Sequence, residues 1–130
     1  MRWFIGFLML ATVTFADVKD DVQSTIASQL DAFLQDDFAR AFEYASPSIQ
    51  RMFRNSDNFG IMVKRGYPMV WRPAQSRFLD FLQDQRGPFQ LVEITDNDGR
   101  VHTLRYDMIE MPAGWRIRGV QVLPGTAFSS

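Results

Sequence analysis

The sequence predicts an α+β domain in which helices come first and an antiparallel sheet follows. In the first half, from about residue 22 to 66, apolar side chains return every three or four residues, which places them on one face of a helix. Beyond Pro73 the apolar residues alternate with polar ones, the period of a strand that buries one face. A run of helices followed by a run of strands indicates helices packed on one side of a sheet.

The first helix is predicted around residues 22–34, where Asp20 and Asp21 suit its positively polarised N-terminal end. The polar residues 35–37 interrupt it, and a short second helix follows. We interpret Asp36 and Asp37, between the two helices, as turn and cap residues rather than as a catalytic pair. The apolar residues assigned to the buried faces are Val22, Ile26, Leu30, Phe33 and Leu34, then Phe38, Ala41, Phe42 and Ala45.

Two more helices are predicted between residues 46 and 66. Ser46 caps the third, with Pro47 at its first helical position. Ser56 or Asp57 caps the fourth, whose end is indicated by Lys64, Arg65 and Gly66. The buried faces are assigned to Ile49, Met52 and Phe53 in the third helix and to Phe59, Met62 and Val63 in the fourth.

The connector "GYPMVWRP", residues 66–73, is predicted to be extended, because each proline keeps the residue before it out of helical geometry. Alternation would then place Tyr67, Met69 and Trp71 on one side and Val70 and Arg72 on the other. In one interpretation Tyr67, Trp71 and Arg72 line a pocket rim or a partner surface. In the other, Tyr67 and Trp71 close the end of the sheet and Arg72 pairs with an acid of the first helix.

Four strands are predicted in the second half. "SRFLDFLQD" and "FQLVEIT" come first, and the turn "DNDG" leads to the long strand "RVHTLRYDMIEM". The turn "PAG" and a last strand, "WRIRGVQVL", complete an antiparallel meander. Gly119 inside the last strand indicates a bulge or bend, a feature that curves a sheet around a cavity.

The N-terminus predicts export. Arg2 is followed by an apolar run over residues 3–13, with Thr14 and Ala16 before Asp17, which is the layout of a secretory signal peptide. We expect cleavage after Ala16, leaving residues 17–130 as a single periplasmic or secreted domain after the signal peptide of residues 1–16. The apolar run is shorter than the roughly 18 to 20 residues that span a bilayer. The alternative is that it is retained as an anchor.

The amino-acid composition excludes several kinds of functional site. The chain has no cysteine, so it forms no disulfide, and it offers neither a cysteine nucleophile nor a cysteine ligand for zinc. With one histidine we predict no metal site, and no motif predicts a cofactor. Fourteen basic residues against 15 acidic ones, net charge −1, give no indication of nucleic-acid binding.

The runs "QLDAFLQDDFARAFEYASPSI", "MVKRGYPMVWRP" and "GWRIRGV" resemble the small exported proteobacterial proteins grouped as domain-of-unknown-function family 4864, in the nuclear-transport-factor-2-like superfamily. The resemblance covers about residues 26–124. It implies a cone in which a curved antiparallel sheet wraps around helices, often with a pocket in the open mouth. Superfamily members include ketosteroid-isomerase-like enzymes and domains that only bind ligands or partners, so the fold does not fix the function. Relatives often dimerise through the convex face of the sheet, which implies a homodimer as one expectation.

Two functions follow as hypotheses. The first is a non-catalytic exported module that binds a small apolar or anionic molecule, or a partner protein, at the mouth of the cone, with Tyr67, Trp71 and Arg72 as binding residues. The alternative is an acid-base lyase or isomerase of the ketosteroid-isomerase-like type, with Asp80 or His102 as the base. Against it, Asp80 suits an edge strand, where a charge discourages aggregation, and His102 suits a strand end with a local hydrogen bond.

Overall fold

The computed structural model describes residues 12–125. Residues 1–11, which hold most of the predicted signal peptide, and residues 126–130 lie outside the described part of the chain. The helices are α1 (Phe15–Leu34), α2 (Phe38–Glu43), α3 (Pro47–Phe53), α4 (Ser56–Gly66) and α5 (Pro68–Trp71). The strands are β1 (Gln75–Asp84), β2 (Gly87–Thr95), β3 (Val101–Met111) and β4 (Gly114–Val122). The predicted α+β order is confirmed.

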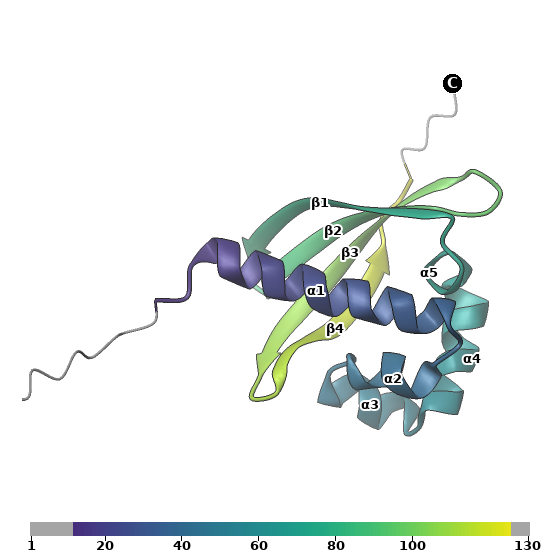
Figure 1. The fold of residues 1–130 in the computed structure, drawn as a ribbon, viewed down its shortest axis with the longest axis horizontal. Helices are drawn as coiled ribbons and strands as arrows, with labels where there is room; N and C mark the ends of the chain where they lie inside the picture. Colours follow the sequence, from purple (N-terminus) through teal and green to yellow (C-terminus); the bar gives the residue numbers. More distant parts are fainter. Residues whose placement is uncertain (1–11, 126–130) are drawn as a thin grey trace, which may run out of the picture.

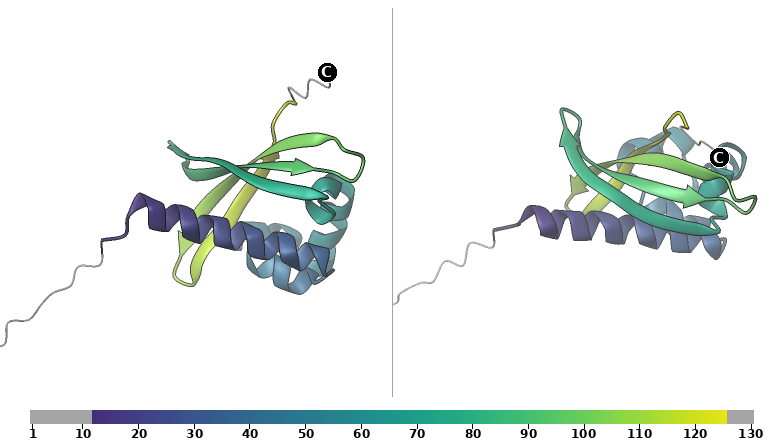
Figure 2. Two further views of the ribbon diagram at one scale, coloured as in Figure 1. Left: turned by 45° about the horizontal axis from the view of Figure 1, so that its top comes forward. Right: turned by 90° about the horizontal axis from the view of Figure 1, so that it is seen from above.

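The four strands form one antiparallel sheet in the order β1-β2-β3-β4. Figure 1 shows α1 running along one face of this sheet, with α2, α3 and α4 gathered beside the C-terminal half of α1. The further views show that the sheet is strongly twisted and that no helix of residues 12–125 covers its other face (Figure 2). Within residues 12–125, no helix is both long and apolar enough to cross a membrane.

Helix α1 begins earlier than its apolar period predicted. Thr14 is its N-cap, and the side chain of Thr14 accepts a hydrogen bond from the backbone N–H of Asp17, whose carboxylate in turn accepts from the backbone N–H of Thr14. This reciprocal capping box satisfies two free N–H groups of the first turn. The ring of Phe15 lies 4.9 Å from that of Phe81 on β1. The predicted cleavage point after Ala16 therefore falls inside a packed first turn.

The next three helices start where short polar side chains cap them. Asp37 caps α2 and Ser46 caps α3, both as predicted. Helix α4 is a correction by one position, because its cap is Asn55 rather than Ser56 or Asp57. The side-chain oxygen of Asn55 accepts from the backbone N–H of Asn58 at 2.8 Å.

The connector predicted to be extended contains a helical turn instead. Pro68 occupies the first position of α5, where its fixed φ suits a helix and its missing N–H has no role. The restriction before proline holds at Tyr67 (φ −134°, ψ 54°) and at Arg72 (φ −134°, ψ 69°). Residues between them are free to turn, so the predicted alternation of sides was wrong and Val70 is the buried residue.

Two irregularities bend the sheet. In the β1–β2 pair the register shifts between Phe78 and Phe81, and in the β3–β4 pair it shifts between Asp107 and Met108. Asp107 lies opposite Gly119 and Met108 opposite Ile117, so the intervening Arg118 is the extra residue of a bulge. The bend predicted from Gly119 is confirmed.

The core lies between α1 and the inner face of the sheet. Val22 and Ile26 on α1 are fully buried, as are Val92 on β2 and Leu104 and Tyr106 on β3. The segment between α2 and α3 joins this core to the outer edge of β4. Ala45 forms a parallel bridge with Ile117, whose N–H donates to the carbonyl of Tyr44.

Candidate functional site

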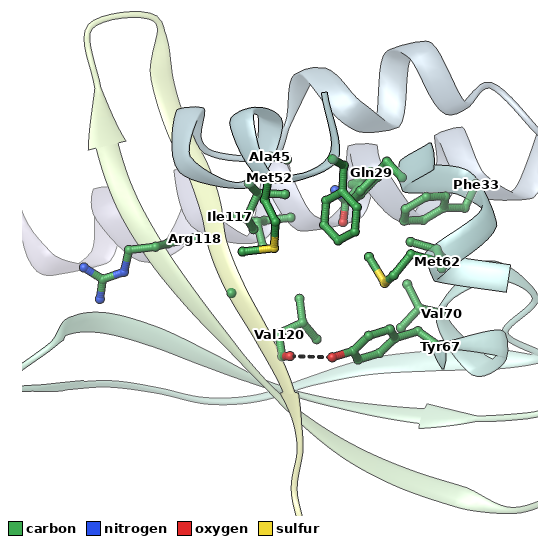
Figure 3. Close-up of a pocket in the computed structure, with 15 residues that line it drawn as sticks. Gln29, Phe33, Ala45, Met52, Met62, Tyr67, Val70, Ile117, Arg118 and Val120 are labelled. Carbon is green, nitrogen blue, oxygen red and sulfur yellow. Dashed lines mark hydrogen bonds between the residues drawn. The ribbon is translucent and has the colours of Figure 1, made fainter. Parts of the chain in front are cut away.

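An apolar cavity of about 300 Å³ opens between the helices and β4. Its walls come from α1, α3, α4, the connector at Tyr67 and Val70, and the bulged strand β4. Figure 3 shows Met52 on one side of this space and Met62 on the other. Phe33 is 1% exposed, whereas Met52 is 71% exposed, so the cavity runs from the core to an open mouth near Met52.

Two neutral polar side chains reach the cavity. Gln29 on α1 is 3% exposed. Its amide nitrogen Nε2 donates to the carbonyl oxygen of Ala41 at 3.1 Å. The hydroxyl of Tyr67 donates to the carbonyl oxygen of Val120 at 3.0 Å. This second bond, dashed in Figure 3, fastens the connector to β4 across the base of the cavity. Both groups are therefore held in fixed orientations by the backbone.

A second tyrosine lies deeper. Tyr106 on β3 is fully buried, and its hydroxyl is the one completely shielded side-chain polar atom without a hydrogen-bond partner among residues 12–125. Burial raises the pKa of the Tyr106 phenol, and the nearby Tyr67 raises it further. Tyr106 is thus a neutral phenol that does not line the cavity.

Arg118 is the charged residue in the cavity wall. It occupies the β4 bulge, and its guanidinium donates to the backbone carbonyl of Arg86 in the β1–β2 turn. Figure 3 shows the side chain directed away from the space between Met62 and Tyr67. The positive charge therefore lies outside the apolar part of the cavity.

The three residues predicted to bind a ligand do not lie together. Tyr67 lines the cavity, but Trp71 and Arg72 lie outside its walls and contact Asp36. Asp36 Oδ1 accepts from Trp71 Nε1 at 2.9 Å and from Arg72 Nη2 at 2.7 Å. The Arg72 guanidinium also stacks 4.4 Å from the Trp71 ring centroid and donates to the carbonyl of Phe33.

This cluster of Asp36, Trp71 and Arg72 ties the α1–α2 turn to α5. The predicted pairing of Arg72 with an acid of the first helix is thus corrected by two residues, since Asp36 follows the end of α1. Hydrogen bonds from Trp71 and then Arg72 hold the pKa of Asp36 below its usual range.

The two candidate bases lie elsewhere. His102 Nε2 is 2.8 Å from Asp96 Oδ2 at the β2–β3 turn, the local hydrogen bond expected for a strand-end histidine, and this bond lowers the pKa of Asp96. Asp80 is exposed in the bulge of the edge strand β1. Neither lines the cavity. Among the described residues, no three potential metal ligands of the His, Cys, Asp or Glu type cluster together.

Met52, Phe53 and Met62 were predicted to lie on buried faces, which is wrong for Met52, since it is 71% exposed at the mouth of the cavity. Gln29 was not singled out. One signal for Gln29 was present, because it falls on the apolar face of α1, three residues after Ile26 and one before Leu30. A glutamine at such a position is buried and must find partners for its amide.

Comparison with known proteins identifies the chain's family. Residues 16–129 match a family model described as "Domain of unknown function (DUF4864)". No curated protein and no solved structure matches the chain. Because the match spans nearly the whole chain, the protein belongs to the domain-of-unknown-function family 4864.

Proposed function

We propose that this protein is an exported, non-catalytic binding module that holds a small apolar molecule in the cavity between its helices and β4. The observation that carries the proposal is the cavity itself, whose walls are almost entirely apolar and which remains open at Met52. At about 300 Å³ it lies at the lower end of the size range of small-molecule sites.

The composition of the walls supports a binding role. Phenylalanine and methionine side chains line both sides, and methionine is flexible and polarizable enough to fit irregular apolar ligands. The few polar groups, Gln29 and Tyr67, are fixed by hydrogen bonds to backbone carbonyls. Apolar walls with a few oriented polar groups are typical of ligand sites.

The positions of the candidate bases favour a binding function over a catalytic one. A general acid or base must reach the bound substrate, whereas His102 is engaged with Asp96 and Asp80 is exposed on β1. The titratable residues in the cavity wall are Tyr67 and Arg118, and Tyr67 already donates its proton to Val120. We therefore favour binding over acid-base chemistry.

Two finer assignments belong to the same proposal. The twisted antiparallel sheet, with helices on one face only, is compatible with a nuclear-transport-factor-2-like cone, and the bulge at Arg118 is the kind of bend that such a cone needs. Export to the periplasm or beyond rests on the layout of residues 1–16. In that setting the cavity would take its ligand outside the cytoplasm.

The test is binding of N-phenyl-1-naphthylamine, an uncharged probe whose fluorescence rises in apolar surroundings, to the purified protein. We expect saturable binding that Met62→Trp abolishes by filling the cavity. Ile61→Trp is the matched control, because Ile61 is the adjacent residue of α4, is 50% exposed and does not line the cavity. Absence of saturable binding, or equal loss in both folded variants, would reject the proposal.

A further inference from the structure

The hydrogen-bonding roles of the polar atoms in the cavity narrow the chemistry of the ligand, an inference that rests on the proposed binding function. Gln29 is the deepest of these groups. Its Nε2 donates to the carbonyl oxygen of Ala41. A carbonyl oxygen can only accept, so the amide nitrogen must face Ala41 and the amide oxygen, Oε1, must face the other way.

The free amide oxygen faces the cavity. Gln29 Oε1 accepts no hydrogen bond from residues 12–125. The only side-chain polar atom in this range that is both fully buried and without a hydrogen-bond partner is Tyr106 Oη. Gln29 Oε1 is therefore not fully buried and retains contact with open space. Gln29 lines the cavity, and in Figure 3 its amide lies among the aromatic side chains of the wall, with the oxygen nearer than the nitrogen to the space between Met52 and Met62. The cavity therefore contains an oriented hydrogen-bond acceptor in an apolar wall.

The second polar group has the same role. The hydroxyl of Tyr67 donates its hydrogen bond to the carbonyl oxygen of Val120. Its oxygen can therefore only accept a hydrogen bond from a ligand. Among the described wall residues the cationic donor is Arg118, which donates to the backbone carbonyl of Arg86 and is directed away from the cavity. Both side-chain oxygens of the wall, Gln29 Oε1 and Tyr67 Oη, can thus accept a hydrogen bond from a ligand.

We propose that the cavity selects neutral apolar molecules that carry a hydroxyl group, and that Gln29 Oε1 accepts the hydrogen bond from this hydroxyl. A ligand without a donor leaves the amide oxygen without a partner once the cavity is filled. A carboxylate has no proton to donate, and its charge would leave water for an apolar wall beside two acceptors.

The experiment compares three ligands of one skeleton as competitors of N-phenyl-1-naphthylamine. 1-Naphthol donates a hydrogen bond, 1-methoxynaphthalene keeps the oxygen without the proton, and 1-naphthoate is anionic. We expect 1-naphthol to bind roughly threefold to tenfold more tightly than the ether, the range of one net hydrogen bond. The naphthoate should bind at least about tenfold more weakly than 1-naphthol.

Two variants test whether Gln29 causes the preference for 1-naphthol over the ether. Gln29→Met keeps the length of the side chain and removes the acceptor, so 1-naphthol and the ether should then compete equally. Gln23→Met is the matched control on α1, because Gln23 donates to Gln90 and does not line the cavity. This control should keep the preference for 1-naphthol.

The outcomes separate the two proposals. If N-phenyl-1-naphthylamine binds but wild-type protein prefers the ether or the naphthoate, or shows no preference, the hydroxyl inference is overturned while the binding function stands. A preference that persists in folded Gln29→Met overturns the role of Gln29. If no probe binds at all, the binding function fails and the inference fails with it. Should Gln29→Met not fold, the wild-type ranking of the three ligands decides.

Discussion

Two tyrosines, Tyr67 between α4 and α5 and Tyr106 on β3, show how differently one residue type can be used. Tyr67 is half-buried and its hydroxyl is bonded to Val120, whereas Tyr106 is fully buried and its hydroxyl has no partner among the described residues. A bonded hydroxyl contributes to stability, and a buried one without a partner loses its bonds to water. The hydroxyl group should therefore raise the free energy of unfolding at Tyr67 and lower it at Tyr106.

Phenylalanine substitutions test this difference. Tyr67→Phe should lower the free energy of unfolding by about 0.5–1.5 kcal/mol, because it leaves the Val120 carbonyl without this bond. Tyr106→Phe should raise the free energy by about 1 kcal/mol, because it removes an unpartnered hydroxyl. Urea unfolding midpoints of the two variants and the wild type measure both effects. A Tyr106→Phe variant as unstable as Tyr67→Phe would mean that the Tyr106 hydroxyl has a partner.

At the scale of elements, α5 is held by the turn between α1 and α2. Asp36 adopts a left-handed conformation (φ 56°), and its carboxylate binds both Trp71 and Arg72. Asparagine and aspartate tolerate this conformation better than most residues, so substitution by asparagine keeps the backbone while removing the charge. The charge itself can thus be tested apart from the turn.

This ion pair predicts a defined pH dependence. The pKa of Asp36 is lowered in the folded protein, so its contribution is full above the unfolded value of about 4 and is lost as the pH falls through the folded value. Wild-type protein should therefore be more stable than Asp36→Asn at pH 6, and the difference should shrink towards pH 2. Urea midpoints across this range provide the measurement, with Asp98→Asn in the exposed β2–β3 turn as control. A difference that is independent of pH would contradict the assignment.

Most elements could be predicted because each carries its own local signal. Caps at Asp37 and Ser46 fixed the starts of α2 and α3, and two-residue alternation located all four strands. The prediction of an extended connector at residues 66–73 was wrong for a local reason. Proline constrains the residue before it, and the prediction extended that constraint over the residues between Pro68 and Pro73, which form a helical turn.

The candidate site could not be predicted to the same degree, because the cavity is space left between elements. Tyr67 was expected near a pocket and lines the cavity, but the expectation that Trp71 and Arg72 would accompany it depended on an extended connector. Gln29 depends on Ala41, twelve residues away, for its orientation. No period or motif encodes which side-chain volumes fail to fill a core.

For the whole molecule, the first turn of α1 spans the predicted cleavage point after Ala16. Thr14 and Phe15 lie before the predicted cleavage point, yet they cap α1 and pack on Phe81. A chain that begins at Thr12 should unfold with a free energy about 1–2 kcal/mol higher than one that begins at Asp17, from the cap and the aromatic contact together. Urea unfolding of both chains checks this, and Thr14→Ala in the longer chain isolates the cap. Equal stability of the two chains would show that the first turn contributes nothing.

The bridge between Ala45 and Ile117 also bears on aggregation. An outermost strand normally exposes a row of N–H and C=O groups that another chain can pair with. On β4 both backbone groups of Ile117 are already bonded, at 2.8 Å each, to the carbonyl of Tyr44 and the N–H of Ser46. At the opposite edge, the bulge in β1 breaks the register and presents the charge of Asp80. Strand addition is therefore hindered at Ile117 on one edge of the sheet and at the bulge on the other.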